Sequence, residues 1–193
     1  HRGLHDRDAG IIENSQSAFA AAIEAGYAIE CDIQLSGDDV PVVFHDYSLN
    51  RLTAQKGMIE HISADQLRRI PLENSSDRPQ SFKDFLDQVS GTVPLVVELK
   101  SQNKRNINLA IGVLDAAKEY TGPLVFKRFD PRLLKALRSK NCSWPIGIVL
   151  EKEKPKEANW AQGFMLRHLL HYPSTRFDFL SCNVDDLTLP MVR

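Results

Sequence analysis

Two carboxylates stand two positions apart in an otherwise apolar stretch of the sequence, Ile29-Glu30-Cys31-Asp32-Ile33. In a β-strand, side chains alternate between the two faces, so Glu30 and Asp32 would point the same way. Two acids on one face of a buried strand need a cation to offset the cost of desolvation. A second apolar stretch ends at His45, whose imidazole can transfer protons near neutral pH. The spacing therefore predicts a hard metal ion beside histidine chemistry.

A third acid, Glu98, lies in the apolar stretch 94–100, and Lys100 follows it on the same strand face. Carboxylates at this density suit Mg²⁺, with Ca²⁺ as the alternative, because both ions prefer oxygen ligands. Glu30, Asp32 and Glu98 are therefore the predicted metal ligands. Two plainer interpretations stay open: Glu30 and Asp32 could pair with arginines, and Glu98 with Lys100 could form a simple ion pair.

With the acids on a metal, two histidines remain free for proton transfer, His45 and His1. One would take a proton from an attacking hydroxyl, and the other would give one to the leaving alkoxide. Arg2 and Lys100 add positive charge suited to a phosphate. Together these groups describe cleavage of a phosphodiester. The sequence does not distinguish attack by water from attack by a neighbouring substrate hydroxyl, which would form a cyclic phosphate.

The elements that must position these residues alternate along the chain. Apolar stretches predict strands over 27–33, 41–45, 94–100, 123–126, 146–150 and 177–182. Helices are predicted over 17–25, 63–67, 81–89, 107–120, 131–139, 158–171 and 187–193, the first capped by Asn14 or Ser15. Such an alternation predicts a parallel sheet covered by helices.

The placement of the polar residues separates two folds of this class. An open doubly wound sheet would fit the length, but no Gly-rich phosphate loop follows the first strand. The ionisable residues instead fall at the carboxyl ends of strands, where barrel enzymes carry their sites. We therefore expect a TIM-type (β/α)8 barrel, incomplete in the given chain because the last β/α unit is absent. A single domain is expected over 1–193, with a small insertion at about 46–85.

Composition limits the possible partners and location. The chain has 193 residues, 42% hydrophobic and 25% charged, with a formal net charge of −1. This balance gives no sign of a nucleic-acid partner, and the absence of a long apolar stretch argues against stable membrane insertion. Three scattered cysteines and the lack of a signal-peptide pattern predict a cytoplasmic protein. The expected partner is a small-molecule phosphodiester.

The ordered motifs resemble the signature blocks of the glycerophosphodiester phosphodiesterase family. The blocks are His1-Arg2-Gly3, Glu13-Asn14 with Ala18-Phe19, Ile29-Glu30-Cys31-Asp32, 41–46 with Leu49 and Arg51, and Glu98-Leu99-Lys100. The resemblance implies a TIM-type barrel with an insertion after the His-Asp strand. It implies cleavage of glycerophosphodiesters to glycerol 3-phosphate and a free alcohol. It also implies three kinds of site residue, namely a divalent metal on Glu30, Asp32 and Glu98, acid–base roles for His1 and His45, and phosphate contacts from Arg2 and Lys100.

The chain departs from the family pattern at Lys127-Arg128, where a small hydroxyl residue often precedes the Phe129 position. A more cationic pocket edge is expected there. Two alternative functions stay open. One is a phosphodiesterase that acts on lysophospholipids or another headgroup diester, and the other is a barrel that binds phosphate compounds without turning them over. The retained pair of histidines, His1 and His45, argues against the second.

Overall fold

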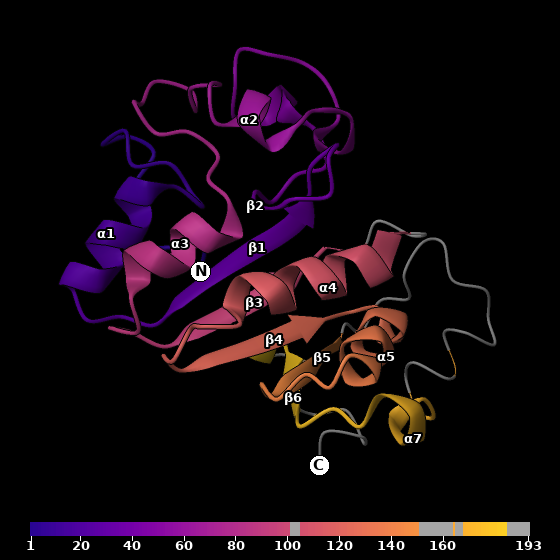
Figure 1. Cartoon of the computed structure of the whole chain (residues 1–193). Coiled ribbons are helices and arrows are strands. Elements are labelled where there is room, and N and C mark those ends of the chain that lie inside the picture. Colours follow the sequence, from indigo (N-terminus) through magenta and orange to yellow (C-terminus); the bar gives the residue numbers. More distant parts are fainter. Residues whose placement is uncertain (101–104, 151–163, 165–167, 185–193) are drawn as a thin grey trace.

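The computed structural model describes residues 1–100, 105–150, 164 and 168–184. Within these residues, six strands form one sheet in the order β2-β1-β3-β4-β5-β6 (Figure 1). The strands are β1 Ile29–Leu35, β2 Pro41–Val43, β3 Leu95–Leu99, β4 Leu124–Arg128, β5 Ile146–Leu150 and β6 Phe179–Cys182. All neighbours except β1 and β2 are parallel. The predicted α/β class is confirmed.

Alternation along the strands gives the sheet two different faces. On β1, Ile29, Cys31 and Ile33 are buried in the main apolar core, whereas Glu30 and Asp32 face the other side. The helices α1 Gln16–Glu24, α3 Phe82–Val89, α4 Asn106–Ala117 and α5 Pro131–Ser139 lie along the apolar face (Figure 1) and contribute to the same core. These helices therefore do not cover the opposite face of the strands, which carries the polar side chains of the candidate site.

The second strand corrects the expectation of an all-parallel sheet. Strand β2 runs antiparallel to β1, with Val43 opposite Ile33. The turn between them holds only 36–40, and parallel strands need a crossover of a dozen residues or more. The strand therefore returns along β1, and the Phe44 amide donates to the Asp32 carbonyl at 3.0 Å. His45 reaches the site on this returning strand rather than at the end of a parallel one.

The turn of this hairpin is fastened to the start of α4. The guanidinium of Arg105 donates to the Ser36 carbonyl at 2.6 Å and forms an ion pair with Asp39. Asn108 Nδ2 donates to the second Asp39 oxygen at 3.2 Å. Strand β2, which leads to His45, is thus paired with β1, and the turn before it is held by the start of α4.

Residues 46–81 hold short helices, and their buried apolar side chains form a second cluster together with Ile12, Val42 and Phe44. The helices are η1 Leu49–Arg51, η2 Ile59–His61 and α2 Ala64–Leu67, the last capped reciprocally by Ser63 and Gln66. Helix α2 confirms the helix predicted over 63–67. The division into one domain with an insertion at about 46–85 stays a prediction.

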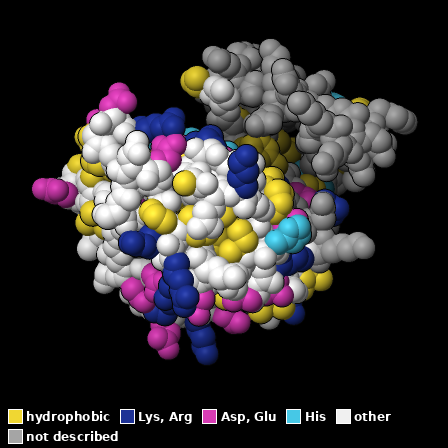
Figure 2. Space-filling view, turned by 90° about the horizontal axis from the view of Figure 1, so that it is seen from above, with side chains coloured by type: hydrophobic (Ala, Val, Ile, Leu, Met, Phe, Trp, Pro, Cys, Tyr) yellow, Lys and Arg dark blue, Asp and Glu magenta, His cyan; other side chains and the backbone are white. Residues whose placement is uncertain are grey.

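Acidic and basic side chains are interspersed on the face seen from above, with single hydrophobic side chains among them (Figure 2). In the part of the chain that the structure describes, none of the helices is long and apolar enough to cross a lipid bilayer. The helix predicted over 187–193 lies outside the described residues, and most of the one predicted over 158–171 does so too. A short helix, α7 Tyr172–Thr175, precedes β6.

Candidate active site

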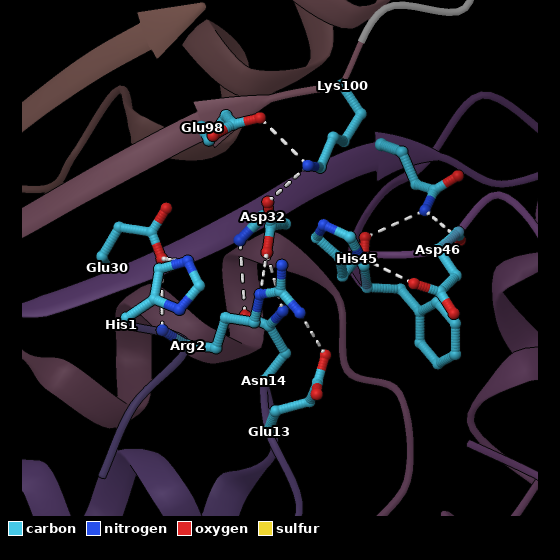
Figure 3. A network of polar contacts seen from close by, with 12 residues as sticks. His1, Arg2, Glu13, Asn14, Glu30, Asp32, His45, Asp46, Glu98 and Lys100 are labelled. Atoms are coloured by element: carbon cyan, nitrogen blue, oxygen red, sulfur yellow. Dashed lines mark hydrogen bonds and ion pairs between the residues drawn. The ribbon is translucent and has the colours of Figure 1, made fainter. Parts of the chain in front are cut away.

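The three predicted metal ligands meet on the polar face of the sheet. Glu30 and Asp32 project from β1 and Glu98 from β3, and Asp32 and Glu98 are paired in the sheet register. Carboxylate oxygens of all three residues lie within 4.8 Å of one another (Figure 3). Asp32 is 2% exposed and Glu98 is 8% exposed. We call these residues the acid triad.

Two lysines neutralise part of the charge of the acid triad. Lys100 Nζ lies 2.9 Å from Asp32 Oδ1 and 3.0 Å from Glu98 Oε1. Lys127 Nζ lies 3.0 Å from Glu30 Oε1 and 3.7 Å from Glu98 Oε2. Burial alone would lower the pKa of Lys100, but the charges of Asp32 and Glu98 outweigh it and raise that pKa above its usual value. The predicted Glu98–Lys100 ion pair is present, and it shares its lysine with Asp32.

The chemistry of the acid triad fits a hard divalent ion. The donors are carboxylate oxygens, which Ca²⁺ binds at about 2.3–2.6 Å and Mg²⁺ at about 2.0–2.1 Å. Among the described residues, no donor makes a hydrogen bond to the buried Glu30 Oε1, although Lys127 is near it. A metal cation suits such an oxygen, because its attraction to the oxygen does not need the geometry of a hydrogen bond.

The segment around Arg2 and Asn14 closes over Asp32. Asn14 Nδ2 donates to Asp32 Oδ2 at 3.0 Å, and Asn14 Oδ1 accepts from the Asp32 amide at 3.3 Å. The Arg2 amide donates to Glu30 Oε2 at 3.1 Å, and the Arg2 Nε lies 3.4 Å from Asp32 Oδ2. Both residues have positive φ, 57° for Arg2 and 54° for Asn14. Asparagine tolerates this region better than most residues, so the turn favours its presence.

Gly3 explains how this segment reaches the sheet. Its φ is +79°, and a Cβ there would lie 2.9 Å from the backbone of Ala18 on α1. A side chain would push the segment away from the helix. The close approach of the two backbones therefore requires a glycine at this position.

His45 is oriented by an acid that is itself held by an arginine. His45 Nδ1 lies 2.6 Å from Asp46 Oδ1, and Arg51 Nε donates to Asp46 Oδ2 at 2.6 Å. The hydrogen bond from Arg51, aided by His45, lowers the pKa of Asp46 to about 2. Gln34 Nε2 donates to the carbonyls of Phe44 and Asp46, at 2.9 and 2.7 Å, and fixes the backbone on either side of the histidine.

Arg51 also joins the His45 side of the site to the first segment of the chain. Its Nη1 and Nη2 donate to the two carboxylate oxygens of Glu13 at 2.9 and 2.7 Å, and Arg2 donates to the same carboxylate at 2.8 Å. Burial alone would raise the pKa of Glu13, but the hydrogen bonds from Arg51 and Arg2 lower it to about 2. Glu13 therefore stays ionised and holds the two arginines together.

His1 lies at the open side of the site. Its ring is 69% exposed, and its Nε2 is 3.8 Å from Glu30 Oε2. In Figure 3 it lies on the Glu30 side of the acid triad, whereas His45 lies on the Asp32 side. The structure thus brings together all seven residues singled out from the sequence, namely His1, Arg2, Glu30, Asp32, His45, Glu98 and Lys100.

Sequence reasoning missed part of the network. The roles of Asn14, Asp46 and Arg51 were not predicted, although each belongs to a family block. Lys127 was expected only to make the pocket edge more cationic, and the structure places its ammonium against Glu30 and Glu98. Strand alternation would have indicated the position of Lys127 if the fourth strand had been predicted to continue past Phe126.

Comparison with known proteins gives a consistent result. The family model of the glycerophosphoryl diester phosphodiesterase family matches residues 1–173. The chain is 35% identical over 100 residues to a glycerophosphodiester phosphodiesterase of Bacillus altitudinis. That match covers 51% of the chain and 36% of the relative. In two other bacterial relatives, the matched part of the chain spans about half of their length, 51% and 52%.

Solved structures resemble the chain over most of its length. A phosphodiesterase of Oleispira antarctica, solved with the product sn-glycerol-3-phosphate, superimposes with a TM-score of 0.78 at 21% identity. That superposition covers 94% of the chain and 72% of that structure. A glycerophosphodiester phosphodiesterase of Thermotoga maritima gives a TM-score of 0.70 at 26% identity, covering 94% and 71%. The chain therefore has the fold of these barrels and covers only part of each. Because its sequence matches the family model over residues 1–173, the chain belongs to the glycerophosphoryl diester phosphodiesterase family.

Proposed function

We propose that the chain hydrolyses glycerophosphodiesters to glycerol 3-phosphate and an alcohol, with a divalent ion held by Glu30, Asp32 and Glu98. The observation that carries this proposal is the convergence of three carboxylates with an imidazole on either side of them. The Oleispira relative, solved with sn-glycerol-3-phosphate, supports the substrate class. Mg²⁺ is the proposed ion, and Ca²⁺ is the alternative.

The proton-transfer roles follow from the surroundings of the two histidines. Asp46 is ionised at neutral pH and lies on Nδ1 of His45, which leaves Nε2 free to accept a proton. This supports His45 as the base that takes the proton of the attacking hydroxyl. His1, exposed at the other side of the acid triad, is then the acid that protonates the leaving alkoxide.

The cations of the site are placed to bind the phosphate. A divalent ion on the acid triad would polarise the phosphoryl oxygens as a Lewis acid. Arg2 and Lys100 both contact Asp32 and therefore lie beside the same spot, where they can bind the non-bridging oxygens. Their positive charge would stabilise the negative charge that develops as the phosphorus is attacked.

The test is a direct assay of product release. Glycerophosphocholine, glycerophosphoethanolamine and a lysophosphatidylcholine are offered side by side, with EDTA and then with Mg²⁺ or Ca²⁺ added back. We expect glycerol 3-phosphate from the first two, loss of the activity with EDTA and recovery with the ion. Hydrolysis that EDTA leaves unchanged would contradict the metal, and release from the lysolipid alone would move the substrate class to lysophospholipids.

A pair of variants separates catalysis from phosphate binding without turnover. We expect His45→Ala to lower turnover by at least about 100-fold, the usual scale for loss of acid–base catalysis. The matched control is His61→Ala in η2, where the ring is 73% exposed and should not matter. A His45→Ala protein that turns over at the wild-type rate would reject the proposed base. A wild-type protein that binds the diester without cleaving it would reject the enzyme.

A further inference from the structure

Lys127 occupies a position that the proposed reaction does not use. It lies on β4, and the register pairs it with Glu98 of β3 on one side and with Gly147 of β5 on the other. Register partners point to the same face, so its side chain reaches the acid triad from the β4 side. Its ammonium lies 3.0 Å from Glu30 Oε1 and 3.7 Å from Glu98 Oε2, and the side chain is 14% exposed.

The space on the β5 side of Lys127 is filled by an aromatic ring. A Cβ at Gly147 would overlap the ring of Phe179, its partner on β6. The glycine therefore admits the ring onto the same face of the sheet as Lys127. With an apolar ring on that side, the carboxylates of Glu30 and Glu98 are the polar groups described next to the ammonium.

The oxygens that Lys127 contacts are oxygens of the predicted metal ligands. The acid triad carries three negative charges, and Lys100 and Lys127 contribute two positive charges next to them. Arg2 adds a further cation beside Asp32 and shares it with Glu13. The group therefore carries little net charge before any metal binds.

We propose that Lys127 is a resident counter-cation that competes with the divalent ion for Glu30 and Glu98. The site consequently binds its metal more weakly than three free carboxylates would. An anion beside the metal offsets the excess positive charge, so metal and phosphate strengthen each other's binding. The inference rests on the proposed metal site and adds that the affinity for the metal depends on the anionic ligand.

The test measures metal binding by the metal-stripped protein and needs no turnover. Calorimetric titration with Mg²⁺ compares the wild type with Lys127→Met and with the charge-conserving Lys127→Arg. We expect Lys127→Met to bind Mg²⁺ at least about tenfold more tightly, because a cation 3.0 Å from a ligand oxygen has been removed. Lys127→Arg should stay close to the wild type. Lys83→Met, which breaks an exposed ion pair on α3, is the matched control and should change nothing.

Inorganic phosphate supplies the second readout. Phosphate should tighten Mg²⁺ binding by the wild type and should do so less in Lys127→Met, where the excess positive charge is smaller. Should Lys127→Met fail to fold, Lys127→Gln takes its place with the same expected direction.

The outcomes distinguish the inference from the proposed function on which it rests. Equal Mg²⁺ affinities for the wild type and Lys127→Met overturn the counter-cation and leave the metal site standing. If Lys127→Arg gains as much Mg²⁺ affinity as Lys127→Met, the counter-cation role is also overturned, because packing and not charge would then be responsible. If no variant binds Mg²⁺ or Ca²⁺, both the metal site and the inference fall.

Discussion

The acid triad and the histidine side of the site hold their side chains by different means. The triad and Lys127 stand on three neighbouring strands, where the pairing of Asp32 with Glu98 and of Glu98 with Lys127 fixes their places. His45 and Asp46 follow a strand, and Arg51 lies in a short 3₁₀ helix. Gln34 fixes the backbone on either side of His45, and the side chains are held by the hydrogen bonds from Arg51 to Asp46 and Glu13.

Because of this difference, the two halves of the site should tolerate different side-chain substitutions. A register is held by backbone hydrogen bonds that no side-chain substitution removes, so the triad should keep its geometry when its charges change. The histidine side is held by ion pairs between side chains, and Arg51 is 41% exposed. Loss of a single guanidinium should therefore disturb its geometry. The following predictions, from the largest expected effect to the smallest, test that contrast.

Asp32→Asn should have the largest effect, on the strand side. The amide keeps the shape of the side chain, and the register with Glu98 should hold the fold. Turnover should fall by roughly 1,000-fold, because loss of a proposed metal ligand would remove several kcal/mol of transition-state stabilisation. Product release and the melting temperature are measured together, with Asp87→Asn on α3 as the exposed control. A fall in turnover of less than tenfold would contradict the role of Asp32.

Arg51→Gln tests the histidine side alone. Turnover should fall by roughly 10-fold to 100-fold, the scale of a misplaced catalytic group. The affinity for Mg²⁺, measured by calorimetry, should not change because the described contacts of Arg51 are with Glu13 and Asp46 and not with the triad. Arg51→Lys should rescue only in part, since an ammonium lacks the fork that binds Asp46 and Glu13 together. A parallel loss of metal affinity would remove the distinction between the two sides.

The same variant should change how stability depends on pH. Glu13 and Asp46 have pKa values of about 2 in the folded chain, below their usual values of 4.5 and 3.8. Their contribution is therefore fully present above about pH 5 and is lost as the pH falls toward 2. Urea unfolding at pH 6 and pH 3 should show a smaller gap between wild type and Arg51→Gln at pH 3. An equal gap at both values would mean that these ion pairs do not stabilise the fold.

Ser81→Ala should have the smallest effect and should leave both sides of the site unchanged. Ser81 Oγ accepts from the Asp84 amide at 3.1 Å and caps α3. Loss of a cap costs about 1 kcal/mol of helix stability. Urea unfolding should show that loss, with turnover and Mg²⁺ affinity unchanged. A change in either would mean that α3 positions the site more directly than its place on the apolar face suggests.

How far the sequence predicted the molecule depended on the range of the interactions. Local patterns predicted α5 over 131–139 and β5 over 146–150 with the bounds that the structure has, because hydrophobic periodicity and Pro131 are properties of neighbours in the chain. The predicted direction of β2 was wrong because the link at 36–40 is too short for the crossover that joins two parallel strands. Strand alternation was enough to bring Glu30 and Asp32 together.

The network around Arg51 could not be predicted in the same way. Its contact with Glu13 joins residues far apart in the chain, and nothing in the sequence near either residue specifies the other. The fourth strand was predicted to end at Phe126, whereas β4 continues to Arg128. The position of Lys127 was therefore missed, because Lys127 lies just beyond the predicted end of the strand. Side-chain pairing across loops and the last residue of a strand are decided by tertiary packing.

The hairpin formed by β1 and β2 bears on the order in which the site forms during folding. It brings His45 back to Asp32 through a short turn, whereas Glu98 reaches them only after the whole segment 46–94 has been closed into a loop. Hairpins form in about 1–10 μs, and long loops close at a greater entropic cost. Glu30, Asp32 and the candidate base should therefore meet early. The third carboxylate would arrive with the central sheet.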